Sequence, residues 1–240
     1  MIALSDEQMT EWRGRHDYLF RIKIKAVEYL YGQHPEDDFL FVDCDTFLYG
    51  SLEVLRSRMA EGRALMHLDE GHPSRMKGRS RKMWNLLKGT TMAGITFSER
   101  HDLWNSGVIG IPAQKAGAVI RDWLALCDGM LDAGVEAFNM EEYALSVALA
   151  EQGSIVAADD QVGHYWGNKA DWEQLVSDLM CEAYMQNKSI DEEVATLDME
   201  RLLQTPIIVD RSSRYAQMCR LAAKLFPVRR RQFVTYCPTR

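Results

Sequence analysis

The chain lacks several of the features that assign a protein to a class at first sight. Its five cysteines are scattered, with no Cys-x-x-Cys spacing, which argues against a zinc site or a disulfide framework and is typical of a reducing compartment. No stretch approaches the ~18 consecutive apolar residues of a transmembrane helix. The first residues have neither the basic region nor the long apolar run of a signal peptide. We therefore expect a cytoplasmic protein with no transmembrane segment.

An excess of basic residues is also missing. The net charge of −7 argues against a general nucleic-acid binder, because phosphate contacts need a basic surface. Two short segments are nevertheless basic, residues 72–82 and the tail around Arg229–Arg231. Both are typical of solvated loops, but they would also attract an anionic substrate or a membrane surface, so peripheral membrane contact stays open.

The regular patterns that are present alternate between two periods. No internal repeat or low-complexity tract interrupts the 240 residues, which are enough for one α/β domain or for one domain with an appended piece. Apolar spacing predicts helices over 17–31, 52–60, 115–131 and 141–150, and strands over 39–43, 64–68, 107–111 and 155–158. Residues 69–100 show no clear pattern, and from 171 onward the chain is mostly helical, with a further strand pattern at 206–209. This alternation predicts an α/β fold with a mixed or parallel sheet covered on both faces.

The most informative segment is FLFVDCDT, residues 39–46. Its apolar start is typical of a buried strand, and Asp43 and Asp45 stand at its C-terminal end. Because side chains at i and i+2 of a strand point the same way, we expect the two carboxylates to converge and Cys44 to pack on the opposite face. Adjacent carboxylates repel each other unless a cation neutralises them, and ligands bind at strand ends in α/β proteins. The segment therefore predicts Mg²⁺ or Mn²⁺ carrying a phosphate-containing substrate.

A purely structural role for this segment stays open, because Asp is also a common turn residue after a strand. Three further segments bear on that choice: WNSGVI at 104–109, NMEEYAL at 139–145 and HYWGNKADW at 164–172. In this order after the Asp-x-Asp strand, they resemble the GT-A glycosyltransferases, in particular the glycogenin and galactosyltransferase-like group. The resemblance covers roughly residues 17–172. It implies an α/β fold of the nucleotide-diphospho-sugar transferase type, with a mixed sheet flanked by helices.

The resemblance also implies a metal site. Asp43 and Asp45 would bind the divalent ion that holds the donor diphosphate, and His164 would supply a third ligand, which suits Mn²⁺ better than Mg²⁺. Gly167 would let a loop approach the phosphates, and Lys169 would neutralise them. Taken singly, His164 is equally typical of a hydrogen-bonded core histidine and Lys169 of a surface lysine.

Other positions would bind the donor sugar and its phosphates. Asn105, Ser106 and Gly107 would contact sugar hydroxyls or line the acceptor site, although they also fit a polar strand entry with a glycine bulge. Glu141 and Glu142 correspond to an acidic or amide pair that contacts the transferred sugar, and they would carry the catalytic role. They equally fit the first-turn acids that a helix dipole favours.

The helix before the Asp-x-Asp strand supplies two basic candidate residues. Arg21 and Lys25 share one helix face at i, i+4, where the family often places a basic residue near the donor phosphates. The alternative is that both side chains are simply exposed to solvent.

The part of the chain before the strand departs from the family pattern. Relatives carry about two βα units before the Asp-x-Asp strand, and these units bind the nucleotide base. Here 38 residues precede the strand. We therefore expect a GT-A-like core with an incomplete donor-binding half at 1–172, and a mostly helical extension at 173–240.

The resemblance implies transfer of a sugar, with a UDP-linked hexose as the favoured donor, to an unknown carbohydrate, lipid or protein acceptor. Two other functions compete with this one. A phosphatase of the haloacid dehalogenase type also begins with an apolar strand and Asp-x-Asp, and Asp159 and Asp160 resemble its distal acidic pair; however, Phe47 stands where that family has Thr or Val. A non-catalytic glycosyltransferase-like scaffold would fit the short N-terminal part.

Overall fold

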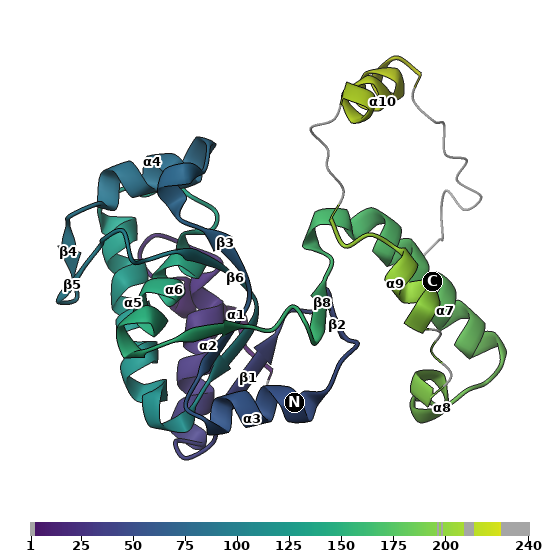
Figure 1. The fold of residues 1–240 in the computed structure, drawn as a ribbon, viewed down its shortest axis with the longest axis horizontal. Coiled ribbons are helices and arrows are strands. Elements are labelled where there is room, and N and C mark those ends of the chain that lie inside the picture. The colour runs from purple at the N-terminus through teal and green to yellow at the C-terminus, as the bar shows by residue number, and fades with distance from the viewer. Residues whose placement is uncertain (1–2, 196, 198, 209–213, 227–240) are drawn as a thin grey trace, which may run out of the picture. The chain divides into compact units, whose positions relative to one another are not determined.

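The computed structural model describes residues 3–195, 197, 199–208 and 214–226 of this mixed α/β protein (Figure 1). They belong to two compact units, Met1–His164 and Tyr165–Arg240. The division falls inside the predicted catalytic core of residues 1–172, so that residues 165–172 are part of the second unit.

A four-stranded mixed sheet forms the centre of the first unit. Its strands follow the order β1 (Phe39–Val42), β6 (Leu103–Ile111), β3 (Ala64–Gly71) and β7 (Ile155–Ala157). β6 runs antiparallel to both of its neighbours, and only β3 and β7 are parallel. The predicted mixed sheet is therefore confirmed. β1 pairs with β6 alone, which makes it an edge strand of this sheet, half-buried rather than fully buried as predicted.

Helices cover both faces of this sheet, as the alternation predicted. Side chains on a strand point alternately to opposite faces, so Met66 and Ile109 contribute to the larger apolar cluster while Leu65 and Val108 belong to the smaller one. The larger cluster includes side chains of α2 (Arg21–Gln33), α5 (Ala113–Asp132) and α6 (Met140–Gln152). The smaller is shared with α3 (Leu52–Ala60), and α1 (Asp6–Arg13) packs on α2.

Several short elements were not predicted from the sequence patterns. β2 (Thr46–Leu48) and β8 (Val162–His164) form a separate antiparallel pair. The patternless segment 69–100 holds the 3₁₀ turn η1 (Pro73–Arg75), helix α4 (Gly78–Leu87) and the hairpin of β4 (Thr91–Met92) and β5 (Ile95–Thr96). α4 buries Met83, Trp84 and Leu87 in the larger cluster, and its basic residues Arg79, Arg81 and Lys82 are exposed.

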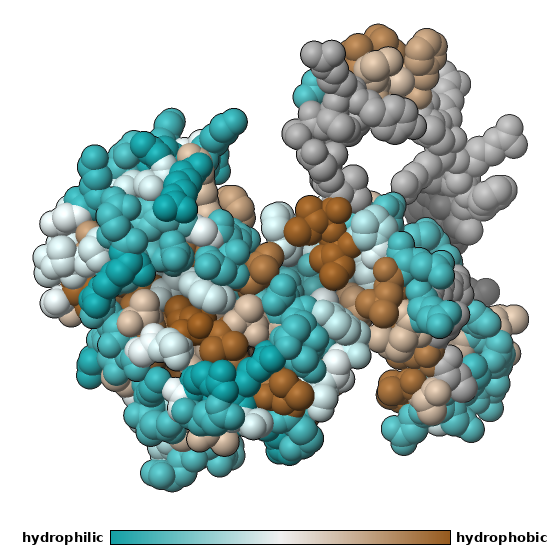
Figure 2. Space-filling model, viewed as in Figure 1, coloured by the Kyte–Doolittle hydropathy of each residue, from teal (hydrophilic) through white to brown (hydrophobic). Residues whose placement is uncertain are grey.

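The described residues of the second unit are mostly helical, as predicted for residues 173–240. It contains the short turn η2 (Trp166–Asn168) and the helices α7 (Lys169–Met185), α8 (Ile190–Ala195), α9 (Met199–Gln204) and α10 (Arg214–Leu225). The predicted strand at 206–209 is wrong for residues 206–208, and residue 209 lies outside the described residues. Many apolar side chains of this unit reach the surface, as Figure 2 shows. Among the described residues, no helix is long and apolar enough to cross a membrane.

Candidate metal centre

The two aspartates lie in the turn that joins β1 to β2. β1 ends at Val42, although the backbone N–H of Asp43 still donates to the carbonyl of Gly107 (2.9 Å). The Thr46 hydroxyl then donates to the Asp43 carbonyl (2.7 Å) and closes the turn. The carboxylates thus converge through a turn and not, as predicted, through the pleat of a strand. The prediction that Cys44 packs in the core is also wrong, because it is exposed.

Pairing of β2 with β8 carries His164 to this turn. Thr46 lies opposite His164 in the ladder. The His164 Nε2 atom is 3.3 Å from an Asp45 carboxylate oxygen and 4.0 Å from one of Asp43. One ligand atom from each of the three residues lies within 4.8 Å of the others. The structure therefore brings together the three predicted metal ligands, two from one turn and one from a strand far along the chain.

The amide of Asn105 determines which nitrogen of His164 faces the carboxylates. The Asn105 side-chain oxygen accepts a hydrogen bond from the Gly107 N–H (3.0 Å), and its NH₂ group donates to Glu70 (3.3 Å). The same oxygen lies 2.9 Å from His164 Nδ1, so Nδ1 must carry the proton and donate it. A hydrogen bond of this kind from the outer ring nitrogen is usual for a metal-binding histidine. It leaves the Nε2 lone pair directed toward Asp45.

Burial favours the neutral form of this imidazole. Burial lowers the pKa of His164 below its ordinary value, although the charges of Asp45 and Asp43 oppose that shift. The ring of His67 packs edge-on against it, with 5.2 Å between centroids, and burial lowers the pKa of His67 too. In neutral His164 the Nε2 atom is a hydrogen-bond acceptor, and it faces the acceptor oxygens of Asp45 and Asp43. A bound cation would stabilise this arrangement.

Gly107 provides the space that His164 occupies. A Cβ atom added at this position would lie 2.1 Å from His164 Nδ1, far inside van der Waals contact. Gly107 thus lies in the interior of β6 and lets the His164 ring approach the backbone closely. The sequence had suggested instead that it stands where a strand begins. This position shows that the Asn-Ser-Gly segment supports the histidine, through the amide of Asn105 and the missing side chain of Gly107.

Lys23 is the basic residue at the centre, and the sequence did not single it out. Its ammonium lies 3.4 Å from Asp43, 4.0 Å from Glu141 and 3.2 Å from the Ser106 hydroxyl. It also lies 5.0 Å from the centroid of the Phe41 ring. Burial would lower the pKa of Lys23, but Glu141 and Asp43 outweigh burial and hold it above its ordinary value. A half-buried, charged ammonium therefore joins the turn of Asp43 and Asp45 to the start of α6.

The two basic residues of α2 that the sequence singled out, Arg21 and Lys25, pair with other side chains. Arg21 donates two hydrogen bonds to Asp128 on α5 (2.8 and 3.0 Å) and one to the Trp12 carbonyl (2.9 Å). Lys25 forms an ion pair with Glu28 on its own helix. Position 23 lies on a different side of the helix from 21 and 25. Lys23 is thus the basic residue of this helix that contacts Asp43, and the donor-binding role of Arg21 and Lys25 stays a prediction.

Glu141 is buried and Glu142 is half-buried at the first turn of α6. Burial raises the pKa of Glu141 to about 7, although Lys23 opposes the shift. Burial, followed by the charge of Glu141, raises the pKa of Glu142 to about 8. Ser106 donates to Glu142 (3.3 Å), whereas the Oε1 atom of Glu141 is buried without a hydrogen-bond partner in the described part of the chain. These carboxyls face polar groups inside the unit and are more than solvated first-turn acids.

Gly167 and Lys169 lie in the second unit. Gly167 is part of η2, where an added Cβ would approach Ile208 at 3.2 Å, and Lys169 is the first residue of α7. The amide of the intervening Asn168 donates to the Pro206 carbonyl (2.8 Å). Their predicted role toward donor phosphates stays a prediction.

The donor atoms of the centre fit a small divalent cation. Carboxylate oxygens suit Mg²⁺ and Mn²⁺, and an imidazole nitrogen shifts the preference toward Mn²⁺. Asp43, Asp45 and His164 would hold such an ion, with Asn105 orienting the imidazole. Comparison of the chain with family models, with curated proteins and with solved structures gave no match. The fold and this cluster define a mixed α/β protein with a candidate metal centre at the end of an edge strand.

Proposed function

We propose that this protein is a metal-dependent glycosyltransferase of GT-A architecture, which moves a sugar from a nucleotide-sugar donor to a carbohydrate, lipid or protein acceptor. A UDP-linked hexose is the donor class that the motif order favours. One observation carries the proposal: Asn105 fixes His164 so that its free nitrogen and the Asp43 and Asp45 carboxylates point to a common centre. All four residues come from the segments that suggested the resemblance.

The surrounding residues have defined tasks under this proposal. A bound Mn²⁺ would offset the negative charge on the leaving nucleotide diphosphate. Lys23 takes the place that was expected for Arg21 and Lys25, as the ammonium nearest the metal ligands. Glu141 and Glu142 provide carboxyl groups that support an oxocarbenium-like sugar. Their raised pKa values let them exchange protons near neutral pH.

The phosphatase alternative finds less support. Its distal acidic pair would include Asp160, but the Asp160 carboxylate accepts two hydrogen bonds from Arg58 of α3 (2.8 and 2.5 Å). This interaction lowers the pKa of Asp160 to about 2, as expected for a structural ion pair. The phosphatase alternative also gives no function to the arrangement of His164, Asn105 and Gly107. A scaffold that had lost catalysis would be expected to lose this arrangement too.

Thermal denaturation in the presence of Mn²⁺, with and without UDP, tests the proposal. A ligand at about 100 times its Kd adds about 2.7 kcal/mol to the unfolding free energy, which raises the Tm of a chain of this size by roughly 5–10 °C. We expect Mn²⁺ to raise the Tm, and UDP to raise it further only when Mn²⁺ is present. Asp43→Asn and Asp45→Asn should abolish both effects. Asp37→Asn, an exposed aspartate at the other end of β1, should leave them intact.

The role of Asn105 gives a second readout. Asn105→Leu removes the acceptor of the His164 proton, so Mn²⁺ affinity should fall about 10–100-fold, as for other residues that orient a ligand. Retention of Mn²⁺ affinity in both aspartate variants would refute the metal centre. Turnover of phosphate esters without any UDP effect would instead favour the phosphatase. A Mn²⁺ effect without nucleotide binding would favour the scaffold.

A further inference from the structure

The carboxy-terminal part of the chain has the opposite charge to the rest. Residues 211–240 contain eight lysines and arginines and no aspartate or glutamate, although the whole chain has a net charge of −7. α10 lies within this segment, and three consecutive arginines follow it at 229–231. Such a run of cations without any acid is attracted to a strongly anionic surface.

α10 adds an apolar stripe to this charge. Met218, Leu221 and Leu225 are 69%, 59% and 65% exposed, and Phe226 follows at 77%. Spacings of three and four residues place Met218, Leu221 and Leu225 along one side of the helix, which ends at Leu225. Lys224 lies beside this stripe, three residues after Leu221. The apolar surface of this helix is visible in Figure 2.

We propose that α10 and the arginines after it bind the surface of an anionic lipid bilayer, with the helix lying in the plane of the interface. A bilayer satisfies both features at once, because the acyl boundary receives the apolar stripe and the headgroups receive the cations. A soluble polyanion would account for the charge but not for the stripe. The proposal does not depend on the glycosyltransferase function, since it concerns a different part of the chain.

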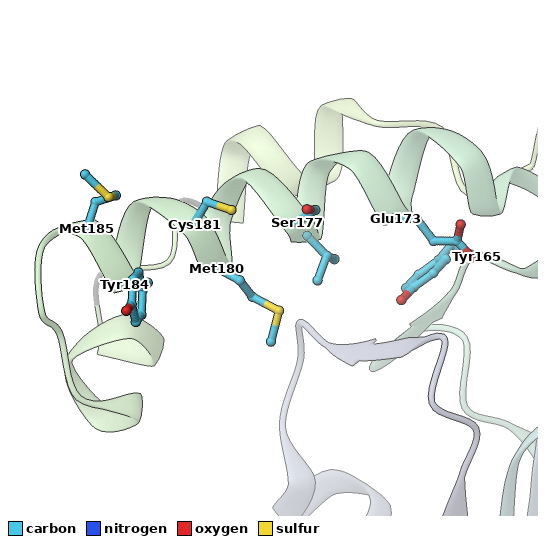
Figure 3. A pocket seen from close by; sticks show the side chains of 8 residues that line it. Tyr165, Glu173, Ser177, Met180, Cys181, Tyr184 and Met185 are labelled. Carbon is cyan, nitrogen blue, oxygen red and sulfur yellow. The ribbon is translucent and has the colours of Figure 1, made fainter. Parts of the chain in front are cut away.

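α7 of the same unit offers the main competing partner for the stripe. Its exposed side chains Met180, Tyr184 and Met185 line a shallow apolar hollow of about 460 Å³, seen in Figure 3. One acidic residue, Glu173, borders it. α10 docked in that hollow would bury its stripe within the protein, which the test below detects.

Sedimentation with lipid vesicles tests the proposal. The full chain should sediment with vesicles that contain phosphatidylglycerol, should not sediment with pure phosphatidylcholine, and should be released by high salt. Each basic residue near an anionic surface contributes about 1 kcal/mol, or about fivefold in partitioning. The variant R229Q/R230Q/R231Q should therefore bind about 100-fold more weakly. Leu221→Glu combined with Leu225→Glu should abolish binding while leaving the Tm of the first unit unchanged.

A matched control removes the same charge elsewhere. Arg79, Arg81 and Lys82 are exposed on α4, so R79Q/R81Q/K82Q should keep nearly full binding. Equal loss in the two triple variants would reveal diffuse electrostatic adsorption and overturn the proposal. Full binding by the Leu221/Leu225 variant would overturn it as well. If that variant instead exposes α7 to proteolysis in the absence of vesicles, the stripe belongs in the α7 hollow and not in a bilayer.

Discussion

The two units of this protein use their apolar residues in opposite ways. In the first unit, both faces of the sheet are covered, and the largest side chains, such as Trp123, Tyr143 and Leu103, are fully buried. In the second, Trp172 is buried, but the apolar side chains of α7, α8 and α10 reach the surface. The first unit therefore supplies its own core. The second has surface available for a partner.

The largest effect should come from filling the space beside His164. Gly107→Ala places a Cβ where the imidazole lies, and overpacking of this kind costs about 1–3 kcal/mol. It should also abolish Mn²⁺ binding, because His164 has to move. Gly110→Ala on the same strand is the matched control: its Cβ would meet Leu65 at 2.8 Å, so the stability loss should be similar but Mn²⁺ binding should survive. Isothermal titration and thermal denaturation measure the two effects, and identical metal affinity in both variants would break the assignment of Gly107.

The next effect concerns the dependence of stability on pH. The folded pKa of Glu141 is about 7, above the ordinary value, so the folded state holds a proton that the unfolded state has already lost. The contribution of Glu141 to the unfolding free energy should therefore be greatest below about pH 4.5 and should fall by roughly 3 kcal/mol as the pH rises through 7. Glu141→Gln should remove this part of the slope, as measured by urea denaturation from pH 5 to 8 without metal. A slope that is unchanged in the variant would show that Glu141 ionises freely.

The smallest effect should appear in the second unit. Tyr184 is 84% exposed on α7, so Tyr184→Ser removes little buried area and should change the unfolding free energy by less than about 0.5 kcal/mol. Tyr143→Phe in the first unit is a useful contrast, since the hydroxyl of Tyr143 is buried without a hydrogen-bond partner among the described residues and its removal should be neutral or stabilising. A large loss of stability from Tyr184→Ser would show that the apolar surface of α7 is already covered by another part of the molecule.

Local patterns located most of the long elements of the first unit. Apolar periodicity was sufficient for α5 and α6, because a helix that covers a sheet repeats its apolar positions every three to four residues. It failed at β2, β8 and the hairpin after α4, since strands of two or three residues hold no complete period. Apolar periodicity also left open which side of α2 faces the candidate metal centre. The sequence therefore pointed to Arg21 and Lys25 and not to Lys23.

By itself, the sequence determined which chemical groups are available: a pair of aspartates after an apolar strand, an Asn-Ser-Gly segment, two adjacent glutamates and one distant histidine. Only the tertiary structure decided how they act together. The pairing of β2 with β8 brings His164 to Asp45, and the amide of Asn105 selects the nitrogen that it presents. The contact of His164 with Asp45 joins residues more than a hundred positions apart, and its contact with Asn105 joins residues 59 positions apart. No local period encodes such a pairing, because its free energy is gained only when the distant segments have come together.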